Sequence, residues 1–251
     1  MADTALETFA PVDLKDALIV AAFPTTGSAA SIAAQYLIRN LELPLVGHLR
    51  IGELSAITAI QDGRATSAVR IFGGEVACRL DKKCPRLYLS PTDRAPPTSV
   101  ALHLADTILD WAGKGGAHLL IALEGVVRSE GDTTPDVFCA AAADDVLKEI
   151  SKRGIPAMER ALIGGITAHI LLLAPARKVR SGAVMVEASR DHPDGRAAAA
   201  LIEALGKIMP DVLMDATPLL QEAMALEGEL SKMRANAADQ TQVNQGVNTF
   251  I

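Results

Sequence analysis

Six consecutive apolar residues stand near the start of the chain, shortly after a charged pair and directly before a proline: Leu18-Ile19-Val20-Ala21-Ala22-Phe23. A strand with one face in water alternates polar and apolar residues, whereas a strand buried on both faces does not. Strands of the second kind occur at the centre of parallel sheets that helices cover on both sides. The run therefore predicts a central parallel strand and an α/β fold.

Strand-like and helix-like segments alternate along much of the remaining chain. Ser28 is placed to cap a helix that ends near Asn40. Later apolar runs predict strands, and residues with helical spacing between them predict helices. This alternation predicts a mostly parallel central sheet flanked by helices. The predicted strands are residues 118–123, 137–140, 160–163 and 183–187, and the predicted helices are residues 98–111, 144–152, 166–173 and 196–207.

The middle of the chain departs from this alternation. Residues 45–51, 56–60 and 67–72 are rich in β-forming residues. Gln61-Asp62-Gly63-Arg64 lies between two of them and is a hairpin signal. The segment therefore predicts an antiparallel hairpin excursion from the main sheet.

Length and composition favour one domain. The chain has 251 residues, of which 49% are hydrophobic and only 3% aromatic, so small aliphatic side chains must fill the core. We expect a single α/β domain over residues 1–233 that ends in helices at about 194–233. Residues 234–251 are mostly polar, although they include Val247, Phe250 and Ile251, and they predict a flexible tail.

Charge and cysteine usage exclude several classes of protein. The net charge of −6 and the absence of a long basic run argue against nucleic acid as a partner. The sequence has neither a secretory signal pattern at its start nor an uninterrupted apolar stretch of membrane-spanning length. Its three cysteines form no CxxC pair and its five histidines are scattered, which predicts no disulfide framework and no metal site. We expect a cytoplasmic protein without a cofactor.

A candidate cleft follows from the predicted sheet. Parallel strands bring the segments after their carboxyl ends to one edge, where α/β folds bind ligands. The candidate cleft residues lie at or shortly after the carboxyl ends of several predicted strands. They are Phe23, Pro24, Thr25, Thr26, Gly27, Ser28, Glu124, Gly164, Gly165 and Glu187.

Each part of this cleft has a functional and a structural interpretation. The turn before the first helix could bind an anion at the helix N-terminus, or Pro24 and Gly27 could only shape a tight turn. Its single glycine, with no lysine after it, favours the tight turn. Glu124 and Glu187 could be a carboxylate pair for acid–base chemistry, or they could cap helices and hold nearby arginines. No serine has the GxSxG frame of a nucleophilic hydrolase.

Four segments together resemble the family of the second proteasome assembly chaperone and its archaeal relatives. The resemblance covers most of residues 16–233 and rests on features in the family's order, among them a strand-FPxxG-helix opening and the Gly164-Gly165-Ile166 turn. The four segments are "LIVAAFPTTGSAASIAAQYLIRNLELPLVGHL", "GIPAMERALIGGITAHILLLA", "GAVMVEASRDHPDGRAAAALIEAL" and "DVLMDATPLLQEAMALEGELSKM".

The resemblance implies a phosphorylase/hydrolase-like three-layer sandwich, a symmetric homo-oligomer and, for archaeal members, a mobile C-terminus that binds proteasome subunits. In those members the C-terminus ends hydrophobic-Tyr-X. Here Phe250 stands in place of the tyrosine and Thr249 in place of the hydrophobic residue. The partner-binding tail is predicted at Val247, Asn248, Thr249, Phe250 and Ile251.

Two hypotheses for the function remain open at this point. The first is a non-enzymatic, homo-oligomeric scaffold that binds proteasome subunits, with the tail as the candidate contact. Alanine-rich helices and the excursion at residues 56–72 offer the surfaces that such an oligomer would bury. The second is a small-molecule or nucleotide-binding enzyme, ligase-like or phosphorylase-like, that uses the cleft at the strand carboxyl ends.

Overall fold

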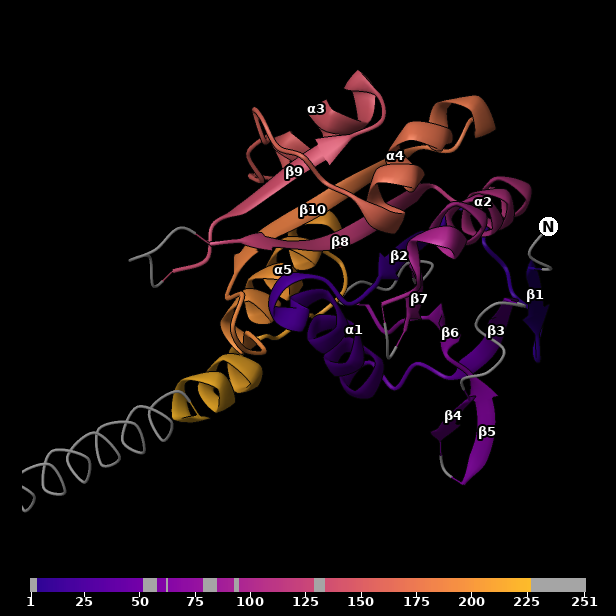
Figure 1. Ribbon diagram of the computed structural model, residues 1–251, viewed down its shortest axis with the longest axis horizontal. Coiled ribbons are helices and arrows are strands. Elements are labelled where there is room, and N and C mark those ends of the chain that lie inside the picture. The colour runs from indigo at the N-terminus through magenta and orange to yellow at the C-terminus, as the bar shows by residue number, and fades with distance from the viewer. Residues whose placement is uncertain are drawn as a thin grey trace, which may run out of the picture.

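The chain folds around an eight-stranded sheet (Figure 1). The computed structural model describes residues 4–51, 58–61, 63–78, 85–92, 95–128 and 134–226. Along the sheet the strands follow the order β1-β3-β6-β7-β2-β8-β10-β9, and β4 pairs with β5 in a separate hairpin. The strands are β1 (Thr4–Thr8), β2 (Leu18–Ala22), β3 (Leu45–Ile51), β4 (Thr58–Gln61), β5 (Arg64–Ser67), β6 (Val69–Glu75), β7 (Arg86–Pro91), β8 (Leu119–Val127), β9 (Val137–Ala141) and β10 (Ser181–Ala188).

Helices follow the strands much as the alternation predicts. A short 3₁₀ turn, η1 (Thr26–Ser28), leads into the first α-helix. Residues 217–226 are also helical. The α-helices are α1 (Ala29–Asn40), α2 (Thr98–Gly115), α3 (Asp144–Lys152), α4 (Gly165–Arg177) and α5 (Gly195–Ile208).

The centre of the sheet is parallel. β2 pairs in parallel with β7 on one side and with β8 on the other, and β8 pairs in parallel with β10. All five residues of β2 are buried, as expected for an apolar run without alternation. Antiparallel strands extend the sheet on both sides, with β6, β3 and β1 beyond β7, and β9 beyond β10. The predicted α/β class is therefore confirmed.

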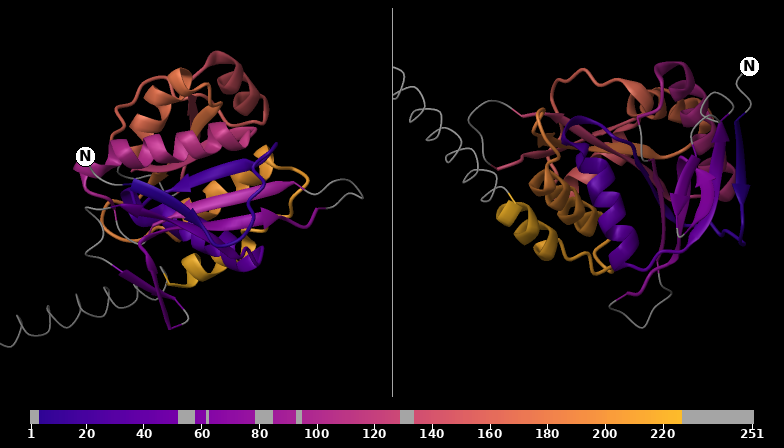
Figure 2. Two further views of the ribbon diagram at one scale, coloured as in Figure 1. Left: turned by 90° about the vertical axis from the view of Figure 1, so that its right-hand side faces the viewer. Right: turned by 60° about the horizontal axis from the view of Figure 1, so that its bottom comes forward.

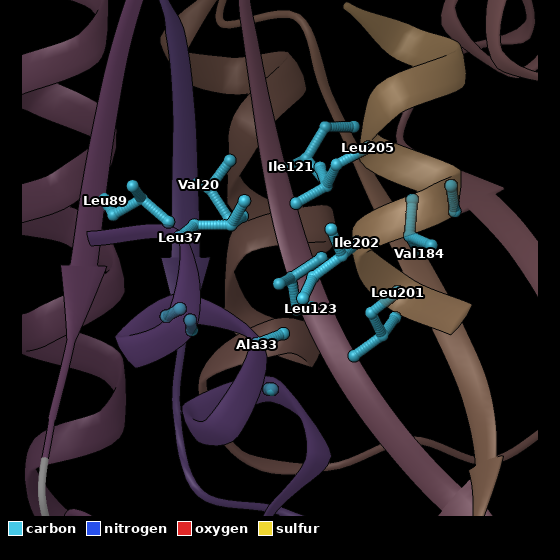
Figure 3. Packing of buried hydrophobic residues seen from close by; sticks show 14 of the residues in the cluster. Val20, Ala33, Leu37, Leu89, Ile121, Leu123, Val184, Leu201, Ile202 and Leu205 are labelled. Carbon is cyan, nitrogen blue, oxygen red and sulfur yellow. The ribbon is translucent and has the colours of Figure 1, made fainter. Parts of the chain in front are cut away.

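Helical layers cover both faces of the sheet (Figure 2). α1 packs with α5 on one face, and α2 packs with α4 on the other. On the first face, Leu37 of α1 and Ile202 of α5 pack over Val20 and Ile121 (Figure 3). On the opposite face, Ile19 lies under Leu104 and Ile170 among others. Burial of each Leu or Ile side chain contributes roughly 1.5–3 kcal/mol to stability. These two clusters therefore supply most of the free energy that holds the helices against the sheet.

Small side chains let the first helical layer lie close to the sheet. Buried alanines form the inner faces of α1 and α5, and a stripe of alanines allows close approach of helix backbones. This arrangement fits a core with few aromatic residues. The alanines are Ala29, Ala30, Ala33 and Ala34 on α1 and Ala197, Ala198, Ala199 and Ala204 on α5.

The antiparallel excursion of the middle segment is confirmed in its described part. Gln61 of β4 pairs with Arg64 of β5 across the predicted turn. Gly63 in that turn has a φ of 74°, a conformation that glycine adopts without strain. The hairpin projects from the end of β3 away from the main sheet (Figure 1).

Two local predictions were wrong. Residues 160–163 form no strand, because the chain next to β9 makes only an isolated bridge between Cys139 and Ala157 and then runs as a loop into α4. Ser28 precedes α1 but its side chain caps nothing, since its backbone is left-handed with a φ of 50°. A side-chain cap is instead present at α5, where Asp194 accepts a hydrogen bond from Ala197 N.

Candidate functional site

The turn after β2 docks onto the ends of two neighbouring strands. Gly125 N, near the carboxyl end of β8, donates a hydrogen bond of 2.7 Å to Thr25 Oγ1. Gly27 has a φ of 63°, and a Cβ atom there would lie 2.9 Å from Ala188 Cβ at the end of β10 and 3.0 Å from Asp194 Cβ. Gly27 is thus required both by its backbone conformation and by close packing. Protein atoms, rather than open space, face the turn at these two residues.

Asp194 is the residue that holds this edge together. Its Oδ2 atom accepts hydrogen bonds from Arg128 Nη2 at 2.8 Å and from Ser189 N at 2.9 Å, and its Oδ1 atom caps α5 through Ala197 N at 2.9 Å. Its own backbone N–H donates to the carbonyl of Gly27 at 2.8 Å. One carboxylate therefore ties the ends of β8 and β10 to α5, while its backbone reaches the turn.

Sequence reasoning did not assign Asp194 a place in the site. The sequence signal available for it was the cap position, an aspartate directly before a run of helix-forming residues. Arg128, an arginine close in sequence to Glu124, pairs with Asp194 rather than with the carboxylate of either predicted acid, and it donates to the backbone carbonyl of Glu187 at 3.0 Å.

Glu124 lies at the carboxyl end of β8 beneath the first turn of α4. Its side chain is buried, and its Oε2 atom accepts a hydrogen bond of 2.6 Å from Thr167 Oγ1. Burial raises the pKa of Glu124 from 4.5 to about 7, although the hydrogen bond from Thr167 opposes that shift. A carboxyl group with such a pKa can hold or release a proton near neutral pH.

The two acids proposed as a pair occupy diagonal positions on neighbouring strands. Met185 of β10 lies beside Glu124, while Glu187 lies beside Val126, one pleat further along. Glu124 and Glu187 project from the same face of the sheet, the face that α4 covers, because Met185 and its alternate neighbours on β10 belong to the α2 and α4 cluster. The structure therefore brings the two acids to one edge without placing them side by side.

The Gly164-Gly165 pair forms the start of α4. Gly164 is the N-cap residue and Gly165 is left-handed with a φ of 65°. A Cβ atom at either position would meet nothing within 4 Å, so at Gly165 it is backbone conformation and not close packing that favours glycine. Two residues further on, Thr167 makes the contact to Glu124, which places the pair at the same edge as the turn after β2.

A pocket of about 640 Å³ opens beside this edge rather than within the predicted cleft residues. It lies between β9, β10 and the loop that precedes α4. Its walls are mostly apolar, with two charged residues at adjacent positions. The residues that line it are Ala140, Met158, Glu159, Arg160, Ala161, Leu162, Ile163 and Met185.

The remaining predictions concern metal, thiol, membrane and tail. Within the described residues, no group of three or more potential ligand side chains could hold a metal ion, and no helix is long and apolar enough to cross a membrane. Burial raises the pKa of the Cys139 thiol, which keeps it protonated. The predicted tail residues 247–251 lie outside the described part of the chain.

Comparison with known proteins identifies the family to which the chain belongs. The model of the PAC2 family matches residues 19–234, which is most of the chain. The chain belongs to the PAC2 family. This confirms the resemblance that the four sequence segments indicate. A curated relative, an uncharacterized protein of Methanocaldococcus jannaschii, is 22% identical over 224 residues, which are 89% of this chain and 88% of that protein.

Solved structures share the PAC2 fold over nearly their whole length. PbaA of Pyrococcus furiosus, described as an archaeal homologue of proteasome-assembly chaperone, has a TM-score of 0.80 at 23% identity and covers 98% of this chain and 99% of its own. PbaB of the same organism, described as an archaeal proteasome activator, has a TM-score of 0.79 at 20% identity, covering 93% and 100%. At this level of identity the likeness establishes the fold.

Proposed function

We propose that this PAC2 family protein is a proteasome assembly chaperone-like scaffold that binds proteasome subunits and catalyses no reaction. The observation that carries the proposal is the family match over residues 19–234, together with the likeness of the whole fold to PbaA and PbaB. The packing of the carboxyl edge supports it. At Gly27 the turn meets Ala188 and Asp194 where a phosphate-binding loop would present open backbone N–H groups.

The scaffold acts as a homo-oligomer that docks through its tail. The tail is Val247, Asn248, Thr249, Phe250 and Ile251. Burying a Phe and an Ile side chain contributes roughly 3–5 kcal/mol before ordering costs, which is enough only for weak binding by one copy. Several tails held on one rigid assembly bind with a much higher avidity, because each later contact is intramolecular.

Removal of residues 248–251 tests this proposal. The full chain is expected to retain purified proteasome subunits on an affinity matrix, whereas the shortened chain loses most of that binding with an unchanged melting temperature. Phe250→Ala should reproduce the loss, and Asn248→Ala serves as the matched control that should bind normally. Unchanged binding together with a lower melting temperature would show that the tail packs on its own fold.

One observation favours a second function, the binding or conversion of a small molecule at the carboxyl edge. Glu124 is a buried carboxyl group with a pKa of about 7 at the position where α/β folds hold ligands. Thermal-shift measurements with nucleotides and nucleosides, on the native chain and on Glu124→Gln, distinguish the two functions. A ligand that raises the melting temperature of the native chain alone would support the second function.

A further inference from the structure

The pocket beside α4 arises where the second helical layer stops short of the sheet edge. α2 and α4 cover the central strands, but β9 is bordered on this face by the loop between Ala157 and Gly164. Ala140 of β9 and Met185 of β10 belong to the pocket lining, and Met158 and Ile163 of the loop complete its apolar part. Its volume of about 640 Å³ could accept several apolar side-chain groups.

An apolar side chain stands fully in water at the rim of this pocket. Leu162 has a relative exposure of 104%, so it makes no packing contact that would hold it in its own subunit. A single exposed leucine is ordinary on a protein surface, but the helix that follows this loop carries a second one. Leu172, on the outer face of α4, is 77% exposed.

Helix α4 has the composition of a helix that is covered on more than one side. Its sequence, GITAHILLLAPAR, is apolar around most of its circumference, whereas a surface helix normally carries a polar outer face. Neighbouring α2 exposes Leu102 at 42%. Asp106 and Asp110 follow Leu102 at one-turn intervals and both contact Arg177 of α4, so Leu102 lies on the stripe of α2 that borders α4.

Two opposite charges stand side by side at the same rim. Glu159 and Arg160 are both exposed and both line the pocket. Among the residues that the structure describes, neither of them takes part in an ion pair. A patch with adjacent positive and negative side chains complements itself when a second copy is rotated by 180°, because each acid then meets the base of the other copy.

We propose that this patch, made of the pocket, its rim and the outer face of α4, is a two-fold interface between copies of the chain. Leu162 of each copy enters the pocket of the other, and Glu159 of each copy faces Arg160 of the other. Mutual insertion requires a two-fold axis, since the projecting side chain and the pocket belong to one patch. The inference rests on the proposed homo-oligomer and names the surface that forms it.

Substitution of the projecting leucine tests the packing. In Leu162→Glu, a charge would have to enter an apolar pocket, so the dissociation constant for self-association should rise at least tenfold in sedimentation experiments. Leu213→Glu is the matched control. Leu213 is 59% exposed but lies on the opposite side, near Asp215, whose carbonyl accepts a hydrogen bond from Tyr36 of α1. Both variants should keep the native melting temperature at concentrations where the chain is monomeric.

Exchange of the two charges tests the symmetry. Glu159→Arg brings four like charges together in its own dimer, and Arg160→Glu does the same with opposite sign, so each single variant should associate at least tenfold more weakly. The double exchange restores complementarity and should restore association. An equimolar mixture of the two single variants should form mixed dimers, which native mass spectrometry detects by mass.

Several outcomes would overturn the inference. They are a native chain that stays monomeric at high micromolar concentration, an assembly with an odd number of subunits, and self-association that Leu162→Glu leaves intact. A monomer whose Leu162 variant alone loses a purified proteasome subunit would reassign the patch to that partner. Binding of proteasome subunits is measured separately, so loss of that binding with the dimer pattern intact would contradict the proposed function alone.

Discussion

The guanidinium group of Arg128 donates a hydrogen bond of 2.8 Å to the carboxylate of Asp194, with only 14% and 2% of the two side chains exposed. The residues are 66 positions apart in the sequence and join the carboxyl end of β8 to the start of α5. Because Asp194 also accepts hydrogen bonds from Ser189 N and Ala197 N, both oxygens of its carboxylate are engaged by protein donors. The pair therefore acts as a structural clamp for the edge where the turn after β2 docks.

Replacement of Asp194 by alanine should destabilise the protein strongly. The change leaves the Arg128 guanidinium buried without its counter-ion and removes the side-chain cap of α5. We expect the free energy of unfolding to fall by about 3–5 kcal/mol, as is typical when one partner of a buried ion pair is removed. Urea denaturation of Asp194→Ala and of the exposed control Asp191→Ala measures the effect. If Asp194→Ala loses no more stability than the control, Asp194 and Arg128 do not clamp this edge of the sheet.

A comparison of alanine substitutions at Gly27 and Gly116 tests how tightly the turn after β2 is packed. Both have a positive φ, 63° and 70° respectively, so alanine at either position costs about 1–2 kcal/mol in backbone strain. A Cβ atom at Gly27 would also press on Ala188, whereas a Cβ atom at Gly116 would meet nothing within 4 Å. Gly27→Ala should therefore lose about 1–3 kcal/mol more than Gly116→Ala in chemical denaturation. Equal losses would show that the turn is not tightly packed.

The buried carboxyl group of Glu124 should make stability depend on pH. Its folded-state pKa of about 7 lies above the ordinary value of 4.5, so the folded protein holds a proton that the unfolded chain releases. The contribution of this group to the free energy of unfolding is fully present below pH 4.5 and is lost as the pH rises through about 7. The total loss is up to about 3 kcal/mol.

Glu124→Gln checks that sign. The amide cannot ionise, yet its carbonyl oxygen can still accept the hydrogen bond from Thr167. The variant should unfold at a higher denaturant concentration than the native chain at pH 8, and the difference should shrink toward pH 5. A variant that is less stable at pH 8 would mean that the ionised Glu124 is stabilised by its surroundings.

Glu149 should make stability depend on pH in the opposite direction to Glu124. It accepts a hydrogen bond of 2.6 Å from Arg180 Nη2, and this contact is the main reason that its pKa lies below the ordinary value of 4.5. Stability from this pair is present above pH 4.5 and is lost as the pH falls through the lowered pKa. Glu149→Gln removes this contribution, so it should lower the melting temperature at pH 7 and change it little at pH 3, which flattens the decline between pH 5 and pH 3. A variant that keeps the native decline would assign the acid sensitivity to other groups.

Much of the fold could be predicted because the pattern of apolar residues within a short segment indicates which of its side chains are buried. The run at 18–23 indicates a strand covered on both faces, and it is the fully buried β2. The false strand at 160–163 shows the limit of the same reasoning. Short apolar segments predict strands only where a partner strand is free to pair, and beside β9 the pairing stops after one bridge at Ala157.

The candidate site could be predicted only in outline. Residues that follow strand ends do meet at one edge, because parallel strands share their direction. The contacts within that edge could not be predicted, since they join positions such as Thr25 and Gly125, which are 100 residues apart. The pocket was not predicted at all, because its apolar lining has no pattern that distinguishes it from core.

The sequence by itself determined the α/β class, the hairpin of the middle segment and membership of the PAC2 family, since each depends on local periodicity or on residue order. The tertiary structure decided which charged groups meet and which are sealed from water. Glu124 and Thr167 are 43 positions apart, and only the stacking of α4 over β8 buries their contact and raises the pKa of the acid. The charge state of a side chain follows from its desolvation and its neighbours, and both are properties of the folded chain.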